Sequence, residues 1–170
     1  VDWENPDILY AAMYRGFRKG WDIISGGPAS EGGMFKTTDG GANWERQGLA
    51  ARYFNKVVAV NASVAWALGR ADLTNTSTVY RTTDGGTTWV PVWTPPSQFL
   101  LSIQALDGNR ALVVGVGGAI YQTSDAGVTW QRQAESLTTK DLNEAVWIDA
   151  NTAWVIGDDG LILKTLTGGR

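Results

Sequence analysis

The 170-residue sequence contains no cysteine and no histidine. Without cysteine the chain can form neither a disulfide nor a catalytic thiolate. Without histidine it lacks a Ser-His-Asp triad, a Cys-His pair and the usual zinc ligands. We therefore expect no metal or other cofactor, and few classes of enzyme remain open to this chain.

Charge and long apolar runs are also scarce. Charged residues make up 18% of the chain, and 14 Lys and Arg against 17 Asp and Glu give a formal charge of −3. Nucleic-acid binding would need a basic face, so we expect no nucleic-acid partner. No run of 18 apolar residues is present, so we expect no membrane span. The chain begins at Val1 and not at Met, as a processed or partial chain would, and we expect an extracellular or periplasmic location.

Glycine and tryptophan, by contrast, are abundant, with 21 and nine copies. Five of the glycines and three of the tryptophans belong to one phrase that occurs three times: TTDGGANW at 37–44, TTDGGTTW at 82–89 and TSDAGVTW at 123–130. The aspartates of the three copies are 45 and 41 residues apart (84 − 39 and 125 − 84). Such a period, with room for four short strands between copies, predicts the blades of a β-propeller.

Each copy of the phrase is typical of a hairpin turn. A carboxylate beside glycine can accept backbone N–H bonds within the turn, and glycine adopts the positive φ angles that other residues resist. The tryptophan then starts the return strand and can pack its ring under the turn. We therefore interpret six side chains as structural and not catalytic: Asp39, Trp44, Asp84, Trp89, Asp125 and Trp130.

The phrase resembles the Asp box, also called the bacterial neuraminidase (BNR) repeat, Ser/Thr-x-Asp-x-Gly-x-Thr-Trp. Sialidases, sortilin-like ectodomains, xyloglucan-cleaving glycosidases and photosystem II assembly-factor propellers share it. The resemblance implies a propeller, and it leaves both enzymes and binding proteins open. Repeats two to four, with Gly-x-x-Gly before the third strand, are most similar to the assembly factors. The first repeat, with NPDILYAAM at 5–13, is more similar to the sortilin and xyloglucanase side.

Aligned on the boxes, the chain divides into four repeats of a single propeller domain or segment, approximately 1–52, 53–99, 100–140 and 141–170. With the strands of a blade named A to D, the pattern is (A)BCD, ABCD, ABCD, ABC. The expected fold class is all-β, with four-stranded antiparallel blades, about four of them in this chain. The first repeat lacks most of strand A and the last lacks strand D. We therefore expect the ring to be completed by further sequence, by a second copy or by a partner protein.

The B–C and D–A connections of a propeller lie on the face opposite the boxes, and that face is free to bind. Two of these connections are long, from Met13 to Met34 and from Arg70 to Thr78. A long loop without secondary structure is usually functional or mobile, although a solvated insertion is the plain alternative. Aromatic rings mixed with guanidinium groups suit a sugar ring, a carboxylate or a protein surface. The candidate binding residues are Tyr14, Arg15, Phe17, Arg18, Lys19, Trp21, Arg52, Tyr53, Arg70 and Trp93.

A glycosidase of this fold would need two carboxylates roughly 5 to 9.5 Å apart. The candidates on the loop side form no evident pair: Asp22, Glu31, Asp72, Glu135 and Asp141. Arg15, Arg52 and Arg70 could gather as in a sialidase, but the Arg-Ile-Pro signature is missing. We therefore favour a non-catalytic binding or scaffold propeller that takes a protein partner or a glycan. The alternative is a segment of a xyloglucanase- or sialidase-like glycoside hydrolase.

Overall fold

The computed structural model describes residues 7–13, 33–47, 53–70, 76–96, 98–133 and 137–168 of the chain. Within these ranges the strands form four antiparallel sheets, which we call blades 1 to 4 in chain order. Blade 1 contains β1 (Leu9–Met13), β2 (Gly33–Thr37) and β3 (Glu45–Arg46). Blade 2 contains β4 (Tyr53–Ala59), β5 (Ala65–Arg70), β6 (Ser77–Thr82) and β7 (Val90–Trp93).

Blades 3 and 4 repeat the same plan. Blade 3 contains β8 (Leu100–Ala105), β9 (Ala111–Gly115), β10 (Ala119–Thr123) and β11 (Gln131–Arg132). Blade 4 contains β12 (Leu142–Trp147), β13 (Ala153–Gly157) and β14 (Ile162–Thr165). The helical structure described in these ranges is two 3-10 turns, η1 (Val116–Gly118) and η2 (Asp158–Gly160), which join the second and third strands of blades 3 and 4.

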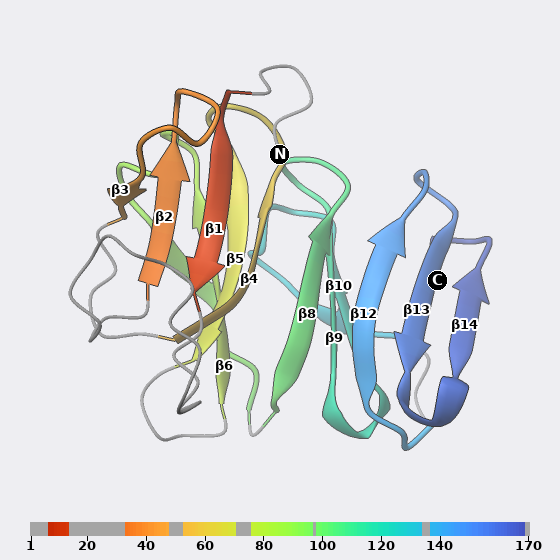
Figure 1. Ribbon diagram of the computed structural model, residues 1–170. Coiled ribbons are helices and arrows are strands. Elements are labelled where there is room, and N and C mark those ends of the chain that lie inside the picture. The colour runs from red at the N-terminus through yellow and green to blue at the C-terminus, as the bar shows by residue number, and fades with distance from the viewer. Residues whose placement is uncertain are drawn as a thin grey trace, which may run out of the picture.

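The blades follow one another around an arc. Strands that are neighbours in sequence are neighbours in their sheet, and the inner strands β4, β8 and β12 lie side by side, with β1 against β4 (Figure 1). The expected fold class, all-β with about four antiparallel blades in this chain, is confirmed.

The core lies between blades. One cluster, with Met34 and Tyr80, joins blades 1 and 2, and corresponding clusters join blades 2 and 3 and blades 3 and 4. Strand β9 is buried along its whole length because blades 2 and 4 cover both of its faces. Strand β13 alternates buried and exposed residues, since blade 3 covers one face only.

Each inner strand of blades 2 to 4 carries a bulge near its start, opposite a glycine. In blade 3 the bulge lies between Leu100 and Ser102, and Leu100 pairs with Gly115. A Cβ atom on Gly115 would lie 2.7 Å from the Leu100 Cα and would overlap the carbonyl oxygen of Phe99. Gly69 and Gly157 stand at the same place in blades 2 and 4. The close backbone approach therefore requires glycine and fixes where each inner strand begins.

The strand registers define two ends of each blade. In blade 2, Tyr53 pairs with Arg70 and Arg70 with Ser77 at one end, while Ala65 pairs with Thr82 at the other. The repeated turn follows Thr82, so it lies at the end away from Arg70. We call these two ends the loop face and the turn face. In Figure 1 the loop face is at the bottom, where β8 and β12 begin.

Candidate functional site

On the turn face, each repeated aspartate accepts hydrogen bonds from its own turn. The backbone N–H of Thr88 lies 2.9 Å and its hydroxyl 2.6 Å from the carboxylate of Asp84, and the Thr82 hydroxyl donates to it at 2.8 Å. The same bonds recur around Asp125, and Asp39 has an asparagine in place of the second threonine. Gly85 and Gly86 have φ angles of 70° and 90°, as a turn of this kind requires.

These bonds favour the ionised carboxylates. The pKa of Asp84 falls from 3.8 to about 2, chiefly because the Thr88 hydroxyl donates to it. The pKa of Asp39 also falls to about 2, chiefly through the Thr37 hydroxyl, and that of Asp125 is lowered chiefly by the Thr129 hydroxyl. The carboxylates are thus engaged within their turns, and their structural role stays a prediction.

The tryptophans of the phrase pack between blades. Trp89 is 8% exposed and meets Tyr10 of blade 1 edge-on. Trp130 meets Trp66 of blade 2 in the same way, while its own ring N–H donates to the Gly127 carbonyl in its turn at 3.2 Å. These rings therefore contact the preceding blade as well as their own turn. Trp44 of blade 1 is 42% exposed.

The loop face of blade 2 holds a guanidinium group between two aromatic rings. The Arg70 guanidinium carbon lies 5.4 Å from the centre of the Tyr53 ring and 5.5 Å from the centre of the Phe99 ring. Contacts of this kind contribute about 0.5–1 kcal/mol at exposed sites. All three residues are half-buried, and the two rings hold the guanidinium in place. We call Tyr53, Arg70 and Phe99 the Arg70 cluster.

A buried serine fixes the third member of this cluster. Ser77 is 1% exposed, and its hydroxyl accepts a hydrogen bond from the Leu100 N–H at 2.8 Å. The Ser77 N–H donates to the Gln98 carbonyl at 3.2 Å. Because these bonds hold the residues on both sides of Phe99, the connection from blade 2 to blade 3 keeps the Phe99 ring beside Arg70.

The loop face becomes acidic toward blade 4. By register, Asp141 of blade 4 is equivalent to Tyr53 and Phe99 of the two preceding blades, because each directly precedes the residue that pairs with the bulge glycine of its blade, Gly157, Gly69 or Gly115. The Asp141 carboxylate accepts the Gly117 N–H at 2.9 Å. Asp159 forms an ion pair with Lys140 at 3.2 Å. The described loop face therefore presents a cation with aromatic rings at blade 2 and carboxylates at blade 4.

Of the residues proposed from the sequence, Tyr53 and Arg70 come together. Trp93 does not join them: it pairs with Val79, and its ring stacks on Trp130 with 4.8 Å between ring centres. The other predicted binding residues lie outside the described residues: Tyr14, Arg15, Phe17, Arg18, Lys19, Trp21 and Arg52. The same holds for four of the five candidate carboxylates, namely Asp22, Glu31, Asp72 and Glu135.

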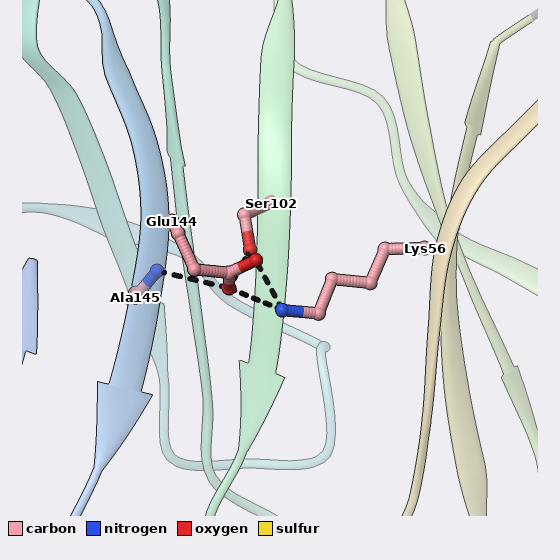
Figure 2. Close-up of polar contacts among 4 residues, drawn as sticks. All are labelled: Lys56, Ser102, Glu144 and Ala145. Atoms are coloured by element: carbon pink, nitrogen blue, oxygen red, sulfur yellow. Dashed lines mark hydrogen bonds and ion pairs between the residues drawn. The ribbon is translucent and has the colours of Figure 1, made fainter. Parts of the chain in front are cut away.

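A polar ladder that the sequence reasoning missed crosses the inner strands (Figure 2). Lys56 of β4 donates to Ser102 of β8 at 3.1 Å and forms an ion pair with Glu144 of β12. The Ser102 hydroxyl donates to the same carboxylate at 2.6 Å, and the Ala145 N–H donates at 3.1 Å. The three side chains follow the bulges of successive inner strands, at sequence separations of 46 and 42.

The ladder joins the inner strands of blades 2, 3 and 4. Burial alone would raise the pKa of Glu144, but the hydrogen bonds from Lys56 and Ser102 outweigh it and the pKa lies below its usual value. Ser102 is 1% exposed and bonded on both sides, so its hydroxyl is not presented to a substrate. The ladder could have been found in the sequence, because each inner strand has a polar residue two positions after an apolar one.

A polar groove of about 650 Å³ lies between the first two repeated turns. Lys36, Asp39 and Glu45 line one side, and the backbone around Gly86 lines the other. The Lys36 ammonium group is already bonded to the Gly85 carbonyl. This groove is on the turn face, at the other end of the blades from the Arg70 cluster.

No group of three or more His, Cys, Asp or Glu residues in the described ranges is placed to hold a metal ion. None of the helices described there is long and apolar enough to cross a membrane.

The four successive antiparallel sheets define a β-propeller protein, and solved propellers are similar to it in fold. YCF48 from Cyanidioschyzon merolae matches with a TM-score of 0.58 and 17% identity, over 78% of this chain and 44% of that one. The Niastella koreensis GH74 enzyme matches with a TM-score of 0.70 and 16% identity, over 100% of this chain and 28% of that one. A structure of YCF48 bound to a D1 peptide matches with a TM-score of 0.51 and 18% identity, over 82% and 74%.

These similarities establish the fold and nothing finer. No family model and no curated protein sequence matches the chain. The chain spans less than half of the first two structures to which it is similar. One of the two YCF48 structures contains a bound peptide, and the Niastella koreensis protein is an enzyme. The shared fold is therefore compatible with a binding protein and with a glycoside hydrolase.

Proposed function

We propose that the chain is a non-catalytic propeller that binds a protein partner through its loop face. The observation that carries the proposal is the Arg70 cluster, in which a half-buried arginine is held between two aromatic rings on the loop face. An arginine fixed in this way is suited to a carboxylate of the partner, and aromatic rings beside it add apolar contact.

The position of the long first connection supports the same face. Strand β1 ends at Met13 and β2 begins at Gly33, and these two residues pair at the end of blade 1 away from the repeated turn. The residues between them include six of the predicted binding residues. YCF48, which has the same fold, has been solved with a D1 peptide bound, so a propeller of this type can take a peptide.

The test uses labelled peptides and fluorescence anisotropy. Peptides rich in Asp and Glu are compared with neutral peptides of matched sequence. The wild-type chain is expected to bind acidic peptides, and Arg70→Gln to weaken the binding at least about tenfold, as for loss of a charge-assisted pair. Arg132→Gln is the matched control, since Arg132 is exposed on the outer strand β11. Equal affinity for acidic and neutral peptides, or an Arg70→Gln chain that binds normally, contradicts the proposal.

A second candidate is a segment of a carbohydrate-active enzyme. The observation in its favour is that the Niastella koreensis GH74 structure aligns with the whole of this chain. Incubation of the chain with xyloglucan separates the two candidates. Release of reducing sugar by the wild-type chain, lost in Asp141→Asn, would replace the binding proposal with hydrolysis.

A further inference from the structure

The polar groove between the first two repeated turns has the size of a small-molecule site. Its volume is about 650 Å³, and such sites usually measure about 300–1,000 Å³. One wall is the turn and the outer strand of blade 1, and the other wall is the turn of blade 2. Since both walls belong to neighbouring blades within the chain, the groove is bounded on each side by described residues. We call it the turn groove.

A buried glutamine in this groove has an unused acceptor. Gln47 is 9% exposed, and its side-chain N–H donates to the Glu45 carbonyl at 3.3 Å. Its side-chain oxygen lies so close over Gly86 that a Cβ atom there would overlap it. This oxygen accepts no hydrogen bond among the described residues. Because a buried acceptor without a donor costs free energy, it is a place for a donor that enters the groove.

The next junction shows that blade packing does not require this polar residue. By register, Val90 and Val92 of blade 2 are equivalent to Glu45 and Gln47 of blade 1. Val92 packs on Gly127 as Gln47 packs on Gly86, with its Cγ2 atom 3.0 Å from where a Cβ on Gly127 would be. It also packs against the cluster that joins blades 2 and 3. The chain therefore fills this position with an apolar side chain at one junction and with an amide at the other.

The turn groove presents further groups with unused hydrogen-bonding capacity. Glu45 is exposed, and its carboxylate has no hydrogen bond or ion pair among the described residues. The Lys36 ammonium group donates to the Gly85 carbonyl at 2.5 Å, and an ammonium group has three N–H donors in all. Asp39, by contrast, is engaged by Thr37 and Asn43 within its own turn. The groove thus offers two acceptors and a donor.

The lining of the groove selects the chemistry of a ligand. Its two cations, Lys36 and Arg46, balance its two carboxylates, Asp39 and Glu45. A charged ligand would therefore meet like charge on part of the wall. Every residue that lines the groove is polar, charged or glycine, so an apolar ligand would find no surface to cover. A neutral ligand with many hydrogen-bonding groups fits both conditions.

We propose that the turn groove binds a neutral oligosaccharide. A sugar hydroxyl both donates and accepts, so one hydroxyl group donates to the Gln47 oxygen, another donates to the Glu45 carboxylate, and a third accepts from Lys36. No aromatic ring lines the groove, so the sugar is held by hydrogen bonds and not by stacking. The expected dissociation constant is on the order of 1 mM, as a few hydrogen bonds give. This site is separate from the loop face and goes beyond the proposed function.

The test is a titration with the neutral disaccharides cellobiose, maltose and xylobiose, followed by ¹H–¹⁵N NMR. With at least one of them, the backbone amide signals of Glu45, Gln47 and Gly86 are expected to shift and to saturate. The signals of Tyr53 and Arg70 on the loop face are expected to stay in place. Cellobionate and the disaccharide of glucosamine are anionic and cationic counterparts of cellobiose, and both are expected to bind more weakly than the best neutral disaccharide.

Two variants remove the acceptors. Gln47→Val supplies the residue that Val92 supplies at the next junction, so the fold should be retained while the affinity falls at least about fivefold. Glu45→Gln is a milder, exposed change that removes the charge of the second acceptor and should weaken binding at least about threefold. Gln133→Val is the matched control, because Gln133 donates to the Gln131 carbonyl as Gln47 does to Glu45 but does not line the groove.

Circular dichroism and the melting temperature check the fold of each variant, and Glu45→Gln decides the result if Gln47→Val does not fold. Three outcomes overturn the proposal: no neutral disaccharide shifts the groove signals, both variants bind as the wild-type chain does, or charged counterparts bind as tightly as the neutral sugars. Arg70→Gln should keep its affinity for the saccharide, and Gln47→Val its affinity for acidic peptides. Failure of this site and failure of the proposed function are therefore distinguishable.

Discussion

At the scale of single residues, the repeated turns show how a surface carboxylate stabilises a fold. The carboxylate of Asp84 accepts bonds from Thr82 and Thr88, and the Thr82 hydroxyl in turn accepts the Gly86 N–H at 2.9 Å. One side chain thus organises the donors of a whole hairpin turn. Every bond of this set stays inside its own blade, so its loss should be felt in stability and not at the loop face.

Asp84→Ala should therefore destabilise the chain and leave binding unchanged. The expected fall in melting temperature is on the order of 5 °C, because exposed donors lose a partner that water replaces in part. Thr83→Ala, an exposed change in the same turn, is the control. An Asp84→Ala chain with normal melting but weaker peptide binding would place the binding site on the turn face.

The same carboxylates predict a dependence of stability on pH. The pKa of Asp84 is about 2 in the folded chain against 3.8 for a free side chain, so its contribution is full above pH 3.8 and is lost as the pH falls toward 2. The difference in melting temperature between wild type and Asp84→Asn should be largest near neutral pH and close to zero at about pH 2. A difference that is constant over this range contradicts the assignment.

At the scale of elements, the three inner strands are joined by a ladder of unlike side chains. The ladder takes one side chain from each of three blades: Lys56, Ser102 and Glu144. Lys56 and Glu144 form an ion pair, and both are also hydrogen-bonded to the Ser102 hydroxyl. The carboxylate side chain is 46% exposed, so solvent screens the pair and its net contribution is modest.

A double-mutant cycle measures this contribution. Lys56→Met and Glu144→Gln should each lower the free energy of unfolding, and their coupling should be about 0.5–1 kcal/mol. Because the pKa of Glu144 is lowered in the fold, the coupling should be present at neutral pH and decrease as the carboxylate becomes protonated. Urea unfolding of the four chains gives the value, and strictly additive effects would mean that the ladder does not couple the blades.

In blade 3, the glycine opposite the bulge links the start of the inner strand β8 to the Arg70 cluster. Gly115→Ala should destabilise the chain by about 1–3 kcal/mol, because the new methyl group overlaps the backbone at Phe99 and Leu100. Movement of Phe99 away from Arg70 should also weaken peptide binding. Gly117→Ala is the comparison: its Cβ would have open space but a φ of 66°, so it should destabilise without affecting the site. Equal effects of both changes on binding would contradict this link.

The elements themselves were predictable from the sequence, and the site only in part. Segments rich in β-branched and aromatic residues and the repeated glycine turns between them define the strands and their order, because these signals are local. The pairing of Arg70 with Tyr53 follows from the ends of two adjacent strands. Phe99 was missed because its approach to Arg70 crosses from one blade to the next. The ladder was missed because its three residues meet through bulges that shift the register.

At the scale of the whole molecule, the described chain repeats one kind of blade–blade interface three times, between blades 1 and 2, 2 and 3, and 3 and 4. Trp44 and Trp89 occupy the same place in the repeated phrase, yet one is 42% and the other 8% exposed. Trp89 is covered because it packs edge-on against Tyr10 of blade 1, so the burial of this repeated tryptophan comes from contact with the preceding blade.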